Sequence, residues 1–173
     1  MSAIIKPKTD VKYWHAGRIF FALARYFDYL TNHMISQFTI DGGIADLVFI
    51  SRAGYATEVE IKISMADWNA DQQKDKWAAE RPHIARFFYA IPETLEDRIP
   101  QWLPAHSGIL VCRRSGKSGR NFDQVSEIRA ATRRPARKLP DRYRAKIHEL
   151  AYYRFWRQEM QFWQRRLHSG EIR

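Results

Sequence analysis

Residues 44–64, IADLVFISRAGYATEVEIKIS, decide the fold of this chain. Two runs rich in apolar and β-branched residues, 44–51 and 55–64, flank the turn sequence RAG at 52–54. Runs of this kind on either side of a glycine turn are typical of two antiparallel strands. Because both runs are apolar almost throughout, they suit the interior of a sheet better than its edge.

The turn also predicts which residues of the two strands lie opposite each other. A pairing that places Arg52 opposite Gly54 also places Asp46 opposite Glu60. Side chains of a strand alternate in direction, so Glu60 and Lys62 share one face of the sheet. The sequence therefore predicts two carboxylates and a lysine together within a largely apolar sheet.

Two carboxylates placed together in this way favour the binding of a cation between them. Like charges repel at this distance and burying them is costly, whereas Mg²⁺ or Mn²⁺ accepts a few carboxylates together with waters. Lys62 beside the metal could orient or deprotonate a water, a chemistry suited to attack on a phosphodiester. In the alternative reading, Asp46 and Glu60 lie on an exposed sheet face and pair with lysines, but the apolar residues around them leave little room for a solvated edge.

The surrounding sequence predicts an α/β fold with a mixed central sheet flanked by helices. We expect one nuclease domain, residues 1–173, with a core over about 13–112 and a basic, partly helical extension over 113–173. The predicted helices are 13–34, about 64–79 and 141–168, and the further strands are 36–41, 86–91, 107–112 and one at 124–130.

Charge is distributed unevenly along the chain. The net charge is +10, but residues 1–112 contribute −1 and residues 113–173 contribute +11. A basic segment of this kind, with aromatic residues among its arginines, favours a nucleic-acid partner. The alternative is a solvated helix that happens to be basic.

Composition excludes several other classes of protein. No apolar run approaches the roughly 20 residues that span a bilayer, so no membrane partner is expected. Cys112 is the only cysteine, and no secretory signal is visible, which together favour the cytoplasm. The six histidines show no metal-ligand spacing, and Cys112 fits a core position better than a nucleophile.

Three segments carry a resemblance to a known family. The run I-A-D-L-V-F-I, then E-V-E-I-K-I-S-M-A-D-W-N-A-D, then R-F-F-Y-A-I-P resembles the PD-(D/E)xK nuclease superfamily, which has a restriction-endonuclease-like fold. Within it, the chain is most similar to the small bacterial DNA-repair endonucleases called MmcB-like, over about residues 41–112. The resemblance implies metal binding by Asp46 and Glu60 with the backbone carbonyl of Ile61, and Lys62 as the catalytic lysine.

Further candidate residues of the site lie beside this motif in the sequence. Glu58 shares the face of Glu60 and is either an outer ligand or a partly exposed strand acid. Asp67, Asp71 and Lys74 recur on one helical face, which is either part of the site or solvated. The family pattern places a lysine near this point, and Lys74 and Lys76 both compete for it. The chain also has Ala45 where the superfamily commonly has proline.

Basic residues beyond 112 are the expected nucleic-acid contacts. On the last helix Arg154, Arg157 and Arg165 lie opposite an aromatic stripe, and further candidates are Arg133, Arg134, Arg137 and Lys138. The expected partner is DNA, with RNA not excluded. Two other functions stay open: a nuclease-like fold that holds nucleic acid without cutting it, and an interaction protein whose long helix forms a homodimer.

Overall fold

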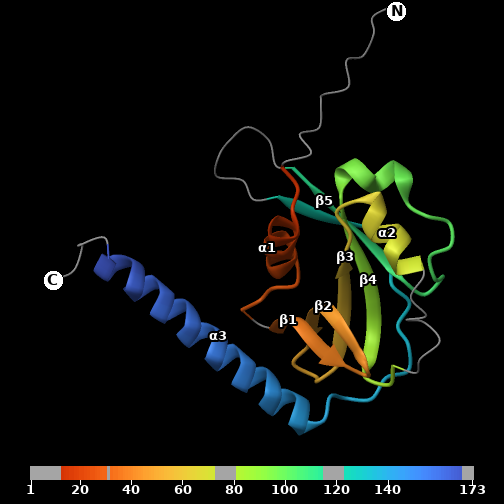
Figure 1. Ribbon diagram of the computed structural model, residues 1–173. Coiled ribbons are helices and arrows are strands. Elements are labelled where there is room, and N and C mark those ends of the chain that lie inside the picture. The colour runs from red at the N-terminus through yellow and green to blue at the C-terminus, as the bar shows by residue number, and fades with distance from the viewer. Residues whose placement is uncertain (1–12, 31, 73–80, 115–122, 169–173) are drawn as a thin grey trace, which may run out of the picture. The chain divides into compact units, whose positions relative to one another are not determined.

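The computed structural model describes residues 13–30, 32–72, 81–114 and 123–168 (Figure 1). The chain divides into two compact units, one ending at Lys138 and the other beginning at Leu139. The elements run in the order α1 (Ala16–Tyr26), β1 (His33–Ile40), β2 (Gly43–Ile50), β3 (Ala56–Ile61), α2 (Met65–Gln72), β4 (Ile84–Pro92), the 3₁₀ helix η1 (Glu93–Arg98), β5 (Gly108–Arg113), β6 (Gln124–Arg129) and α3 (Asp141–His168).

The six strands form one mixed sheet in the order β1-β2-β3-β4-β5-β6. β3 pairs in parallel with β4 and β4 with β5, while the other neighbours are antiparallel. The predicted α/β class with a mixed central sheet is confirmed, and β2 and β3 are interior strands as expected. The pairing of Leu47 with Val59 confirms the register predicted from the turn.

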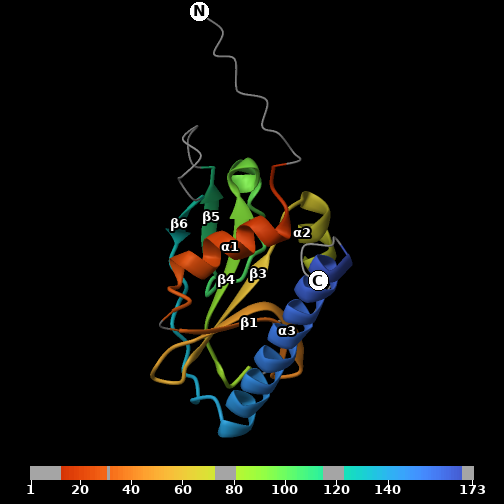
Figure 2. The ribbon, with the colours of Figure 1, turned by 90° about the vertical axis from the view of Figure 1, so that its left-hand side faces the viewer.

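One face of the sheet packs against α1 (Figure 2). Ile19, Ala22 and Leu23 of α1 join a buried cluster with apolar residues of β2 to β5. In β3 it is Val59 and Ile61 that face this cluster. The helix is tied further to β6, since the Tyr26 hydroxyl donates to Glu127 at 3.2 Å. Because side chains alternate in direction along a strand, Glu58 and Glu60 of β3 point to the opposite face of the sheet.

That opposite face is covered by α2 and the loop after η1. Trp68 of α2 is fully buried, with its ring centroid 4.8 Å from that of Tyr89 on β4 and 6.3 Å from that of Trp102. Phe87 also packs edge-on against Tyr89, at 4.9 Å. The charged residues of β3 thus lie beneath aromatic side chains rather than in open solvent.

The first helix is shorter than predicted. Its apolar stripe continues to residue 34 in the sequence, but α1 ends at Tyr26 and Met34 lies in β1. Asp28 adopts a left-handed φ of 52°, and the amides of Asp28 and Tyr29 bond back to Arg25 and Ala24. This is a Schellman ending, in which Asp takes the place more often held by glycine. A turn, rather than further helix, leads into the sheet.

The remaining boundaries need only small changes. β1 ends at Ile40, and its turn to β2 is Asp41-Gly42, both with positive φ, as in the two-residue hairpin turns that match strand twist. The long helix over 141–168 is confirmed, whereas the predicted end of the second helix lies outside the described residues. Among the described helices, none is long and apolar enough to cross a membrane.

Candidate functional site

The site is built around the end of β3. Glu58 and Glu60 point away from the α1 side, and Lys62 follows directly after the strand. All three side chains are buried, with Glu60 only 4% and Lys62 only 5% exposed. The backbone amide of Lys62 donates to the carbonyl of Ala90 at 2.9 Å, which fixes this chain end to β4. The reading in which Glu60 lies on an exposed sheet face is therefore wrong.

Lys62 lies between two carboxylates. Its ammonium nitrogen is 3.1 Å from Asp71 Oδ1 and 3.7 Å from Glu60 Oε2. The Tyr89 hydroxyl donates to the other oxygen of Asp71 at 3.1 Å. Asp71 is 1% exposed, so it is buried and ion-paired rather than part of a solvated helical face. Asp71 of α2, itself bonded to Tyr89 of β4, therefore fixes the position of the Lys62 ammonium group.

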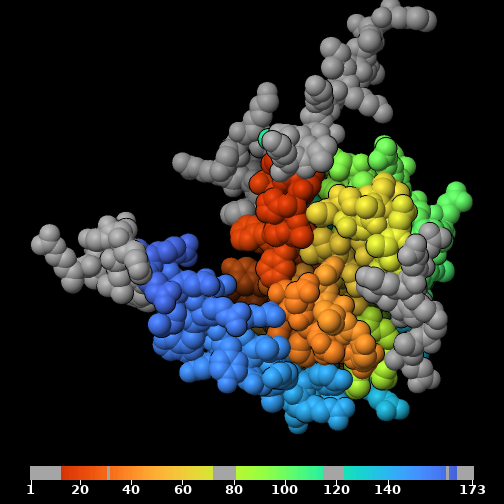
Figure 3. Space-filling model, in the orientation of Figure 1, coloured from red at the N-terminus to blue at the C-terminus, as the bar shows by residue number. Residues whose placement is uncertain are grey.

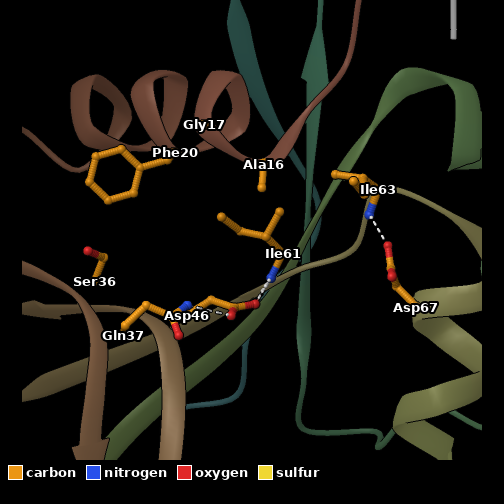
Figure 4. Close-up of a pocket in the computed structure, with 9 residues that line it drawn as sticks. All are labelled: Ala16, Gly17, Phe20, Ser36, Gln37, Asp46, Ile61, Ile63 and Asp67. Atoms are coloured by element: carbon orange, nitrogen blue, oxygen red, sulfur yellow. Dashed lines mark hydrogen bonds between the residues drawn. The ribbon is translucent and has the colours of Figure 1, made fainter. Parts of the chain in front are cut away.

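Asp46 on β2 contacts the backbone at the end of β3. Its Oδ2 accepts the amide of Ile61 at 2.9 Å, and its Oδ1 accepts the side-chain amide of Gln37 at 3.1 Å (Figure 4). The bond to Ile61 lies just beyond the Leu47–Val59 pair, where the pairing of β2 with β3 ends. The structure thus places Asp46 against the backbone between Glu60 and Lys62.

A pocket of about 340 Å³ opens beside Asp46. Its lining comes from the first turns of α1, from β1, β2 and β3, and from the start of α2: Ala16, Gly17, Phe20, Ser36, Gln37, Asp46, Ile61, Ile63 and Asp67. In Figure 3, α1 in red, the β1–β2 region in orange and α2 in yellow meet on this side of the molecule. Asp46 is therefore partly accessible to solvent, whereas Glu60 and Lys62 are buried.

Glu58 has a different environment. Its carboxylate lies 2.7 Å from the guanidinium of Arg81, which also donates to the carbonyl of Ile40 at 3.3 Å. Glu58 is 1% exposed, so it is not a partly exposed strand acid. This buried ion pair favours a structural role for Glu58, which attaches Arg81, in the segment before β4, to the sheet.

Asp67 caps α2. Its Oδ2 accepts the amides of Ile63 at 3.1 Å and Ser64 at 3.0 Å, and Ser64 Oγ accepts the amide of Asp67 at 3.2 Å. This reciprocal pair is a capping box, with Asp in place of the more usual Glu or Gln. Lys74 and Lys76, the two candidates for a further lysine, lie outside the described residues.

The donor set around β3 suits a hard divalent cation. Asp46, Glu60 and the carbonyl of Ile61 offer oxygen atoms, which Mg²⁺ and Mn²⁺ prefer. Among the described residues there is no group of three or more His, Cys, Asp or Glu side chains arranged to hold a metal ion. Mg²⁺ usually retains several waters and is bound through only one or two carboxylates. Asp46 and Glu60 would therefore provide enough carboxylate ligands.

The basic residues expected to contact nucleic acid lie in two segments, one after β6 and the other on α3. The segment after β6 is anchored by its backbone, since the amide of Arg134 donates to Ala85 at 2.9 Å and that of Arg137 to Pro82 at 2.7 Å. Arg133, Arg137 and Lys138 keep exposed side chains in that segment. On α3, Arg157 and Arg165 are exposed and Arg154 is partly exposed.

Three residues of this region were not predicted from the sequence. Arg81 and Tyr89 reach the buried charges from β4 and the chain before it, and Gln37 reaches Asp46 from β1. A lone Arg, Tyr or Gln on another segment carries no spacing signal. The strand predicted over 86–91 contains Tyr89, but the sequence did not indicate which strand lies beside it.

The mixed six-stranded sheet with flanking helices is consistent with a restriction-endonuclease-like fold. A family model described as DNA repair protein MmcB-like matches residues 6–145, and the chain therefore belongs to the MmcB-like family of DNA repair proteins.

Among solved structures, a protein of unknown function from Silicibacter pomeroyi has a TM-score of 0.56 and 22% identity to this chain. The match covers 91% of this chain and 93% of that one, and it concerns the fold alone. No curated protein matches.

Proposed function

We propose that this protein is a Mg²⁺- or Mn²⁺-dependent nuclease that hydrolyses phosphodiester bonds of DNA in repair. The observation that carries the proposal is the buried Lys62, held 3.1 Å from Asp71 and 3.7 Å from Glu60 at the end of an interior strand. Burying a lysine with two acids is costly and adds little to stability, which favours a chemical reason for the arrangement. The family membership supports a role on DNA.

In the proposed reaction, water adds to phosphorus, one P–O ester bond breaks, and the leaving oxygen gains a proton. Asp46 and Glu60, with the carbonyl of Ile61, would hold the cation, which supplies charge stabilisation and a more acidic water when bound. Lys62 would orient the attacking water through its ammonium group. Asp71, fixed by Tyr89, keeps that ammonium in place.

A second function is favoured by one observation. Both oxygens of Asp46 already accept hydrogen bonds, from Ile61 and from Gln37. A site satisfied in this way would suit a protein that binds nucleic acid without cutting it. Carboxylate oxygens carry further lone pairs, so these bonds do not prevent cation binding.

The deciding experiment incubates the protein with supercoiled, linear, single-stranded and branched DNA in Mg²⁺, Mn²⁺ or EDTA. We expect cleavage of at least one substrate with either cation and none in EDTA. Binding without cleavage of every substrate would support the non-cleaving alternative.

Variants of Lys62 test its role. Lys62→Ala should abolish cleavage and leave DNA affinity nearly unchanged, since the lysine acts on the attacking water. Lys62→Met preserves more of the buried volume and controls for loss of packing, with melting curves to verify that both variants fold. Full activity in a folded variant would assign the chemistry to another group.

A further inference from the structure

Gln37 has an unusual backbone for a strand residue. Its φ is 50°, in the left-handed region, although it lies inside β1. Pairing with β2 keeps the same register on both sides, with Ser36 opposite Leu47 and Phe38 opposite Ala45. The residue that would face Gln37 in this register is Asp46. A side chain with a Cβ in this conformation is strained, and such strain is kept only where the surroundings enforce it.

The strained residue directs its side chain to Asp46. The amide of Gln37 donates to Asp46 Oδ1 at 3.1 Å, while the backbone amide of Ile61 donates to Oδ2 at 2.9 Å (Figure 4). Two donors from opposite sides fix the plane of the carboxylate. Gln37 and Asp46 both line the pocket, and Gln37 itself is exposed, so core packing does not account for its conformation.

A carboxamide suits this place chemically. It donates a hydrogen bond without bringing a positive charge that would compete with a cation for Asp46, as Lys or Arg would. It also avoids the like-charge repulsion that Glu would add beside Asp46. Hydrogen-bond partners of ligating carboxylates orient the ligand, and their loss typically weakens metal affinity or activity by about 10- to 100-fold.

We propose that Gln37 is a positioning residue of the candidate site, and that its backbone strain is retained because it delivers the amide to Asp46. The inference rests on the proposed metal-dependent function. The left-handed conformation of Gln37 brings its amide to Asp46, but the same conformation is unfavourable for a residue of strand β1. Removing the side chain should therefore weaken the site without weakening the fold.

The test uses two glycine substitutions in the same strand. Gln37→Gly removes the amide and relaxes the left-handed backbone, whereas Thr39→Gly changes an exposed strand residue two positions away, outside the site. We expect Gln37→Gly to melt at or above the wild-type temperature in EDTA, and Thr39→Gly to melt below it. In calorimetric titration with Mn²⁺, Gln37→Gly should bind about 10- to 100-fold more weakly and Thr39→Gly as tightly as wild type.

A third variant and a kinetic measurement complete the test. Gln37→Met keeps a long side chain and the strain but cannot donate, so it should bind Mn²⁺ as weakly as Gln37→Gly. On a cleaved substrate both variants should lower kcat with little change in KM. If wild type and Gln37→Gly bind Mn²⁺ equally, the positioning inference is overturned and the nuclease proposal stands. If wild type binds no cation and cleaves nothing, both are overturned.

Discussion

At the scale of single residues, the pair formed by Glu58 and Arg81 gives a sharp stability prediction. Both are buried and lie 2.7 Å apart. Arg81→Met leaves the Glu58 carboxylate buried without its cation, and breaking such a pair costs about 3–5 kcal/mol. The double variant Glu58→Leu, Arg81→Met should be closer to wild type than either single change. Urea unfolding of the four proteins measures the coupling.

The same pair separates two roles for Glu58. If Glu58 is structural, Glu58→Gln should lower the free energy of unfolding and leave Mn²⁺ affinity in the folded protein near that of wild type. Unchanged stability together with a large loss of Mn²⁺ affinity would instead make Glu58 an outer ligand of the cation.

A second residue-scale prediction concerns Cys112 on β5. Burial raises the pKa of its thiol to about 12, and Asp123 adds to the effect. At pH 8 the thiol is protonated, and only the thiolate reacts readily. We expect a disulfide-exchange reagent to label Cys112 only as the protein unfolds in urea, so that labelling follows unfolding. Rapid stoichiometric labelling of the native protein would show that β5 is more open than the structure indicates.

At the scale of elements, the capping box makes α2 depend on Asp67. Asp67→Ala removes the acceptor for the amides of Ile63 and Ser64 and should cost about 0.5–2 kcal/mol. Asn69→Ala, at an exposed position of the same helix, is the matched control and should not destabilise. Thermal melts measure both, and Mn²⁺ titration should be unchanged by either. A loss of Mn²⁺ affinity in folded Asp67→Ala would return Asp67 to the metal site.

The elements that the sequence predicted well are those whose pattern is local. The apolar runs around Gly54 indicated two interior strands, and the twofold alternation of side chains then fixed the partner of each residue. The first helix was overestimated, because an apolar stripe does not reveal that Asp28 adopts a left-handed turn. Gln37 and Arg81 were missed for a related reason: backbone conformation and contacts between distant segments leave no trace in residue spacing.

At the scale of the whole molecule, the charge asymmetry predicts strong salt dependence. Replacing Arg154, Arg157 and Arg165 by Gln removes three charges and keeps helix propensity. We expect weaker binding to every DNA sequence, and a slope of log K against log salt lower by about two to three for duplex DNA. Mn²⁺ binding should survive, because the substitutions are far in sequence and chemistry from Asp46 and Glu60.

The matched set lies in the first unit. Arg133, Arg137 and Lys138 are also exposed, and their replacement by Gln removes the same charge from another surface. Fluorescence anisotropy at several salt concentrations compares the two triple variants. If only the second set flattens the slope, the DNA path follows the segment after β6, and the arginines of α3 merely solvate that helix.

The strand order also has a consequence for how this protein folds. β1, β2 and β3 follow one another through tight turns, so their pairing closes only short loops and carries little entropic cost. β4 must instead return in parallel beside β3, a non-local pairing that is intrinsically slower. Tyr89 arrives with β4, and Arg81 lies just before it. We therefore expect Glu60 and Lys62 to stay hydrated while β2 and β3 pair, and to lose their water only in the late step that docks β4.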